Sequence, residues 1–125
     1  MRDQGSMRPH DGQASLEIVA SFLDERTVRV TVAGVADLAT EAELGRALLA
    51  IVASKPLAGL EVDLRQVSFL DSCGIRALVQ ARNAAVNVGC AMWLTNPTPI
   101  VRKVLEITGL DRVFSRPHAM TASAP

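Results

Sequence analysis

The sequence predicts an α/β domain, with a mixed sheet of four strands and helices packed on it. Segments with apolar residues at every second position alternate along the chain with segments whose apolar residues recur every three or four positions. A strand–helix–strand unit over residues 60–95 requires a right-handed crossover between parallel strands. The chain has 125 residues, 49% of them hydrophobic, which is enough for one domain with a full core.

The first two predicted strands form a hairpin. Apolar side chains stand at alternate positions over residues 16–22 and again over residues 28–32, which is typical of half-buried strands. The connection at residues 24–26 is short and polar, so the two strands are expected to pair antiparallel. Gly34 is expected to end the second strand, and residues 35–39 to form a loop that carries Asp37.

An amphipathic helix and a third strand are predicted next. Thr40 and Glu43 have the spacing of a capping box, and an inner stripe follows, formed by Leu44, Ala47, Leu48, Ile51 and Val52. Lys55-Pro56 ends this helix because the residue before a proline disfavours helical angles. Residues 60–64 alternate as a strand, and residues 65–70 are expected to form a turn.

The last third of the chain repeats this alternation. A second helix over residues 72–88 ends at Gly89, with an apolar face formed by Ile75, Leu78, Val79 and Val86. Residues 90–95 are nearly all apolar, as in a strand that is covered on both faces. Thr98 caps a third helix that starts at Pro99, with an inner stripe of Ile100, Val101, Val104 and Leu105. Thr108-Gly109 ends this helix, and residues 110–114 form a short packed segment.

Charge and hydropathy exclude several kinds of partner. Thirteen basic and thirteen acidic residues cancel without a basic block, which argues against a nucleic-acid partner. No apolar run approaches the roughly 20 residues that cross a bilayer, and the polar residues 1–13 are unlike a signal peptide. We therefore expect a cytoplasmic protein without a membrane partner. Residues 1–14 are expected to be a flexible segment, residues 15–114 the domain, and residues 115–125 a loose tail.

Neither a metal site, a cofactor nor catalysis is expected. Cys73 and Cys90 lack a metal-ligand spacing, and the helix predicted between them holds them too far apart for a disulfide. Nucleophilic catalysis by Ser72 or Cys73 would need a base. Both histidines, His10 and His118, lie in the segments expected to be loose. The sequence also has no Gly-rich phosphate loop, so the protein is not expected to be an enzyme.

Ser72 is the residue on which a functional prediction can be built. It follows the third strand and opens a helix, so it lies at the carboxyl edge of the predicted sheet, where function gathers in open α/β sheets. Unpaired backbone N–H groups and the helix dipole favour negative charge there, which suits a serine that is phosphorylated and dephosphorylated. The alternative is that Ser72 is a plain helix N-cap.

Four short stretches carry a resemblance to a known family. They are Gly34-Val35-Ala36-Asp37, Val62-Asp63-Leu64, Phe69-Leu70-Asp71-Ser72-Cys73-Gly74, and Asn96-Pro97 through Val101-Arg102-Lys103-Val104-Leu105 to Thr108-Gly109-Leu110. Through these stretches, residues 28–114 resemble the STAS domain of bacterial anti-sigma factor antagonists, also called anti-anti-sigma factors. Each stretch is weak alone, but the four in this order are specific.

The resemblance implies a partner-switching role in stress-response transcription. An anti-sigma factor with a histidine-kinase-like ATPase fold would phosphorylate Ser72, and a serine phosphatase would reverse this. The unphosphorylated protein would bind the anti-sigma factor and free a sigma factor. The implied partner-binding residues are Asp37, Asp71, Ser72, Cys73, Gly74 and Arg76. Two residues depart from the family pattern: Val35 replaces an acidic residue, and Cys73 replaces a second hydroxyl, so Ser72 is the only hydroxyl of its tetrapeptide.

Each of these assignments has an alternative. Asp37 can instead hold its loop through backbone bonds, and Asp71 can be a turn residue. Cys73 is either a redox sensor or a small residue that stands in for serine. STAS domains also occur in stress-signalling scaffolds, in anion transporters and as partners of lipid-transport ATPases, where Ser72 would be a structural cap on a docking surface. Trp93 is expected in the core rather than at an interface.

Overall fold

The strands and helices follow one another in the predicted order. The computed structural model describes residues 16–117, so the expected flexible segment at residues 1–14 and residues 118–125 of the expected tail lie outside the described residues. The elements are β1 (Leu16–Phe22), β2 (Thr27–Ala36), α1 (Glu41–Ser54), β3 (Gly59–Leu70), α2 (Ser72–Asn87), β4 (Ala91–Thr95), α3 (Pro99–Ile107) and α4 (Leu110–Val113).

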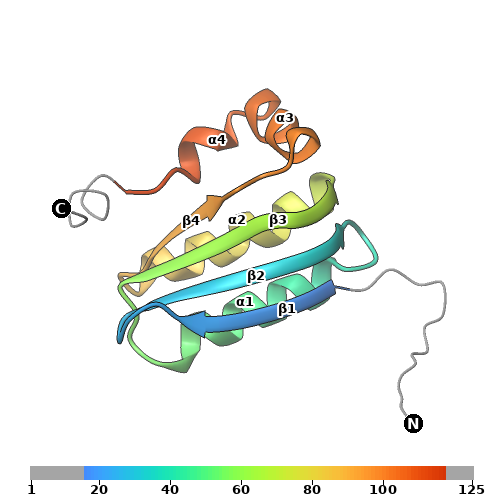
Figure 1. Cartoon of the computed structure of the whole chain (residues 1–125). Coiled ribbons are helices and arrows are strands. Elements are labelled where there is room, and N and C mark those ends of the chain that lie inside the picture. The colour runs from blue at the N-terminus through green and yellow to red at the C-terminus, as the bar shows by residue number, and fades with distance from the viewer. Residues whose placement is uncertain (1–15, 118–125) are drawn as a thin grey trace, which may run out of the picture.

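The four strands form one mixed sheet in the order β1-β2-β3-β4 (Figure 1). β1 pairs antiparallel with β2, whereas β3 lies parallel to both β2 and β4. This confirms the predicted fold class and the predicted hairpin. The last partners of β3 and β4 are Asp63 and Thr95, so the second half of β3 extends beyond β4 and pairs with β2.

The core lies between the sheet and the helices α1 and α2, which cover the same face side by side (Figure 1). Leucines of α1, such as Leu44 and Leu48, and small residues of α2, such as Ala77 and Ala81, bury the valines and leucines of β2 and β3. Trp93 of β4 is 2% exposed, which confirms that it belongs to the interior. The guanidinium carbon of Arg116 lies 5.6 Å from the centre of the Trp93 ring.

β3 is longer than the sequence pattern predicts. Residues 65–70 were expected to form a turn, but they continue the strand and pair with β2 as far as Leu70, the partner of Ala36. The register shifts twice along this ladder, and at each shift β3 has one residue more than β2. These bulges break the two-residue period, so that Val67 and Leu70, three positions apart, are both buried. A pattern search for strict alternation therefore misses this half of the strand.

Three smaller predictions are also wrong. Gly34 does not end β2, because the strand passes through it to Ala36, with Gly34 at a φ of 123° in the bulged region. Val86 of α2 and Ile100 of α3 were placed on inner faces, but both are exposed. Apart from Leu78, the buried residues of α2 are small, namely Gly74, Ala77, Ala81 and Ala85, so hydrophobic size alone does not identify most of this buried face.

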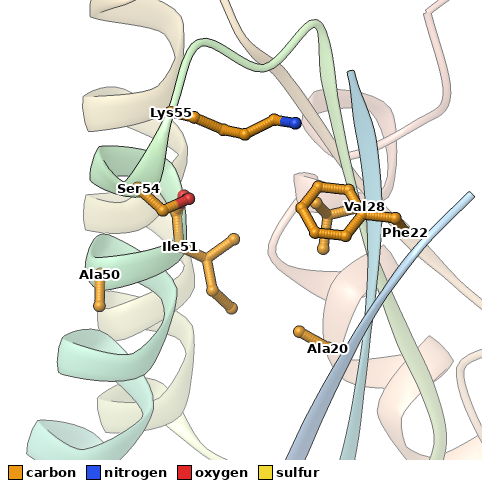
Figure 2. A pocket seen from close by; sticks show the side chains of 7 residues that line it. All are labelled: Ala20, Phe22, Val28, Ala50, Ile51, Ser54 and Lys55. Carbon is orange, nitrogen blue, oxygen red and sulfur yellow. The ribbon is translucent and has the colours of Figure 1, made fainter. Parts of the chain in front are cut away.

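β1 was predicted to be half-buried, and only its first end is. Leu16 is buried, whereas Phe22 at the other end is 60% exposed, because β1 is the edge strand and α1 leaves a gap beside it. This gap is an apolar pocket of about 330 Å³, lined by Ala20, Phe22, Val28, Ala50, Ile51, Ser54 and Lys55 (Figure 2). The Lys55 ammonium lies 4.7 Å from the centre of the Phe22 ring.

Candidate functional site

The carboxyl ends of β2 and β3 meet at one edge of the sheet, at the end opposite the pocket of Figure 2. Ala36 and Leu70 are partners in the last rung of the ladder, and the Asp71 N–H donates to the Ala36 carbonyl at 3.1 Å. Asp37 and Asp71 are the residues that follow these two strand ends. The structure therefore brings the two loops predicted to carry the site into contact, although their residues are more than thirty positions apart in the chain.

Asp71 is the N-cap of α2, and Ser72 is the first residue of the helix. The Asp71 carboxylate oxygen Oδ1 accepts from the Cys73 N–H at 2.8 Å and from the Gly74 N–H at 3.2 Å. Ser72 is exposed, and no residue between 16 and 117 hydrogen-bonds to its hydroxyl. The reading of Ser72 as the structural cap is therefore wrong, because its neighbour performs that task and leaves the serine hydroxyl available.

Gly74 fixes how closely α2 approaches the strand end. A Cβ atom at this position would stand 2.4 Å from the Ala36 carbonyl oxygen, 2.8 Å from the Ala36 Cβ and 2.7 Å from a methyl carbon of Leu70. Such distances are shorter than van der Waals contact, so only glycine permits this approach. The absence of a side chain at Gly74 therefore lets the first turn of α2, and Ser72 with it, lie directly against the sheet edge.

The loop after β2 is held by Thr40 rather than by the predicted capping box. The buried Thr40 hydroxyl donates to the Val35 carbonyl at 2.7 Å and accepts from the Asp37 N–H at 3.0 Å, so it points back into the loop and makes no cap bond to α1. Glu43, the second member of the predicted box, instead accepts from the Leu16 N–H at 3.4 Å. The loop competes successfully for the hydroxyl, which is why the box does not form.

Asp37 takes part in the same loop. Its carboxylate oxygen Oδ1 accepts from the Ala39 N–H at 3.0 Å. This is the structural role that the sequence left open for Asp37, because a backbone bond two residues ahead is typical of an Asx turn. Half-buried Asp37 thus shapes the loop beside the start of α2.

Arg76 forms an ion pair with Glu41, a residue that the sequence analysis did not single out. The Arg76 Nε donates to Glu41 Oε2 at 2.6 Å, and an Arg76 Nη donates to Glu41 Oε1 at 3.0 Å, which is a bidentate pair between the N-terminal parts of α2 and α1. The hydrogen bond from Arg76 lowers the pKa of the Glu41 carboxyl, and the Glu41 carboxylate raises the pKa of Arg76. Nothing in the sequence signals a pair that spans 35 positions.

Cys73 lies beside this ion pair. The same Arg76 Nη lies 3.8 Å from the Cys73 Sγ, and Cys73 is half-buried. Cys90, beyond the other end of α2, is buried, and burial raises the pKa of its thiol. Both cysteines are free thiols.

The site offers an exposed hydroxyl at a helix N-terminus, at the same edge of the fold as Asp37, Asp71 and the ion pair of Arg76 with Glu41. Negative charge on that hydroxyl would meet the positive end of the helix dipole. Over residues 16–117 no group of His, Cys, Asp and Glu is arranged to hold a metal ion. His10 and His118 lie outside the described residues, so the expectation that they are remote from Ser72 stays a prediction.

Comparison with known proteins identifies the fold. The family model of the STAS domain matches residues 22–124. The structure of the anti-sigma factor antagonist SpoIIAA in its unphosphorylated form is similar, with a TM-score of 0.69, 20% identity and coverage of 85% of this chain and 92% of that one. An anti-sigma factor antagonist from Mycobacterium paratuberculosis has a TM-score of 0.66, 28% identity and coverage of 79% and 82%.

A membrane protein shares the fold as well. The murine Solute Carrier 26 family member A9 anion transporter matches with a TM-score of 0.65 and 18% identity, over 90% of this chain but only 22% of the transporter. Within residues 16–117 no helix has the length and hydropathy of a membrane span. No curated protein matches the sequence significantly.

Proposed function

The chain belongs to the STAS domain family, and on this premise we propose that it is an anti-sigma factor antagonist controlled by phosphorylation of Ser72. In the unphosphorylated state it binds an anti-sigma factor with a histidine-kinase-like ATPase fold, which frees a sigma factor. That anti-sigma factor phosphorylates Ser72 and thereby ends the complex. A serine phosphatase restores the binding-competent protein.

The observation that carries this proposal is the state of the Ser72 hydroxyl. It is exposed and has no hydrogen-bond partner among the described residues, because Asp71 caps the helix in its place. A phosphate at this position is compatible with the fold, since the helix N-terminus tolerates negative charge. The 28% identical antagonist from Mycobacterium paratuberculosis adds support for the same class of function.

The switch acts on the partner rather than on the fold. Phosphorylation adds about −1.5 to −2 charges to the surface at Ser72. A clash with the partner that weakens binding by about 3 kcal/mol would lower the affinity roughly a hundredfold. SpoIIAA in its phosphorylated form also matches this fold, with a TM-score of 0.63 over 86% of this chain, as expected if a phosphate leaves the domain intact.

The residues around Ser72 divide into two groups in this proposal. Ser72, Cys73 and Arg76 lie on the accessible first turns of α2 and contact the anti-sigma factor. Asp71 and Gly74 position the helix, and Asp37 shapes the adjoining loop, while both carboxylates add negative charge to the binding surface.

Phosphorylation with a candidate anti-sigma factor kinase and ATP, read by mass spectrometry, tests the proposal. We expect one phosphate on Ser72 in the wild-type chain and none in Ser72→Ala. Ser68→Ala is the matched control, because Ser68 is another exposed serine near the end of β3 and its removal should leave the phosphorylation of Ser72 unchanged. Phosphate elsewhere, or none with every candidate kinase, would contradict the proposal.

A binding experiment addresses the switch itself. Immobilised wild-type protein and Ser72→Ala are expected to retain the anti-sigma factor, whereas Ser72→Glu is expected to lose it. Equal retention by all three would speak against a charge-controlled interface. That result would favour the other STAS role, a constitutive interaction module of a scaffold or transport system, for which the transporter match is the supporting observation.

A further inference from the structure

The Arg76 guanidinium is shared between two helix starts. It binds both carboxylate oxygens of Glu41 in the first turn of α1, at 2.6 and 3.0 Å, and one of its nitrogens lies 3.8 Å from the Cys73 Sγ in the first turn of α2. The side chain thus turns back toward the N-terminus of its own helix. Both partners are near the surface, since the Arg76 side chain is 57% exposed and that of Glu41 is 20% exposed.

Ser72 is four positions before Arg76 on the same helix. Residues at this spacing are neighbours on a helix surface, and an anion four residues before a cation is the more favourable orientation. A phosphoserine at position 72 would carry up to two negative charges and three acceptor oxygens, against one charge on Glu41. The phosphate and the Glu41 carboxylate would therefore compete for one guanidinium.

We propose that phosphorylation of Ser72 transfers Arg76 from Glu41 to the phosphate, so that the ion pair between α1 and α2 exists only in the unphosphorylated protein. This inference rests on the proposed function, because it takes Ser72 as the modified residue. Arg76 becomes the intramolecular partner of the phosphate, and the Glu41 carboxylate is left unpaired at the start of α1. The anti-sigma factor then meets an altered charge pattern on both helices, not only an added phosphate.

The exchange can be measured with phosphoserine inserted genetically at position 72, which needs no kinase. The first readout is the second pKa of the phosphate, followed by phosphorus NMR. The carboxylates of Asp37, Asp71 and Glu41 lie on the loop and the helix starts at this edge of the fold and raise this pKa, whereas Arg76 lowers it. We expect Arg76→Gln to raise the phosphate pKa by about half a pH unit. Glu41→Gln should lower it, because the substitution removes a carboxylate that repels the phosphate and competes with it for Arg76.

The matched control is Arg82→Gln, which removes the same charge from the same helix ten positions after Ser72 and is expected to leave the phosphate unchanged. The second readout is the pKa of Glu41, followed by carbon NMR of its carboxyl. The pKa of Glu41 should rise on phosphorylation. The rise should be larger in the otherwise wild-type chain, which loses the ion pair, than in Arg76→Gln, where the only effect left is repulsion between the phosphate and the Glu41 carboxylate.

Two outcomes would overturn the proposed exchange. In the first, Arg76→Gln leaves the second pKa of the phosphate unchanged. In the second, Arg76→Gln changes that pKa but Glu41 keeps its low pKa on phosphorylation, which would mean that Arg76 bridges both groups. Failure of the proposed function looks different. If no kinase modifies Ser72 but inserted phosphoserine takes Arg76, the antagonist role fails and the exchange stands. If a kinase modifies Ser72 and Arg76→Gln has no effect on the phosphate, only the exchange fails.

Discussion

The helices α1 and α2 cover the same face of the sheet but are seated on it differently. α1 packs with large side chains, among them Leu44 and Leu48, and a Cβ atom added at its Gly45 would meet nothing within 4 Å. α2 packs mostly with small residues, Gly74 and three alanines beside the larger Leu78, and a Cβ atom at Gly74 would collide with the end of β2. The helix that presents Ser72 is thus the one whose position leaves no freedom at its first turn.

The two helix starts show the same contrast. At α2, Asp71 caps the helix with two hydrogen bonds to backbone N–H groups. At α1, Thr40 turns its hydroxyl back into the preceding loop. Two separate sets of hydrogen bonds therefore fix the geometry around Ser72: those of the Asp71 cap at the start of α2, and those of Thr40 in the loop after β2. Each set can be removed alone.

The largest expected effect comes from the two helix glycines. Gly74→Ala should destabilise the domain by about 3 kcal/mol or more, because the new methyl group meets the backbone carbonyl oxygen of Ala36, which cannot rotate away. Gly45→Ala, the same change on α1, should stabilise it by about 0.5–1 kcal/mol, since the site is open and alanine is the better helix former. Urea unfolding measures the stability of both variants. If Gly45→Ala lowered the free energy of unfolding as much as Gly74→Ala does, the difference in how the two helices pack would be refuted.

The next effect concerns the loop anchor. Thr40→Val removes a buried hydroxyl and leaves the Val35 carbonyl and the Asp37 N–H without this partner, so we expect a loss of about 2 kcal/mol. Thr40→Ser keeps the hydroxyl and should recover most of that stability. If valine is tolerated as well as serine, the loop does not depend on these bonds. Thermal or urea unfolding of the three proteins distinguishes the cases.

A smaller loss is expected at the cap of α2. Asp71→Ala should cost about 1 kcal/mol, because the Cys73 and Gly74 N–H groups lose their acceptor. Asp71→Asn should be nearly neutral, since its amide oxygen can accept the same bonds. Amide hydrogen exchange at residues 73 and 74 provides a local readout. Unchanged protection in Asp71→Ala would show that another group caps the helix.

The smallest effect is expected for the ion pair between the helices, which lies near the surface and is screened by salt. Because Arg76 holds the pKa of Glu41 below its ordinary value, the pair stabilises the fold above the unfolded-state pKa, and this contribution is lost as pH falls through the folded-state pKa. Arg76→Gln should therefore be less stable than wild type at neutral pH and equally stable in acid. A deficit of the same size at both pH values would contradict this assignment.

Much of the fold could be predicted because many of its strands and helices depend on residues that are close together in the sequence. Alternation identified β1, most of β2 and the first half of β3, and the Thr98 cap with Pro99 marked the start of α3, where the Val101 N–H donates to the Thr98 hydroxyl. The position of Ser72 at the start of α2 was predicted in the same way. Prediction failed where a contact with a distant segment altered the local preference, as at Thr40 and along residues 65–70.

The sequence by itself determined the order of the elements, the parallel crossover and the placing of a serine where a strand gives way to a helix, since these depend on residues within a few positions of one another. Only the tertiary structure decided which side chain caps that helix, how closely Gly74 approaches Ala36, and that Arg76 pairs with Glu41. The physical reason is competition. A hydroxyl, carboxylate or guanidinium can serve several partners, and the partner is chosen by what packing brings within hydrogen-bond distance.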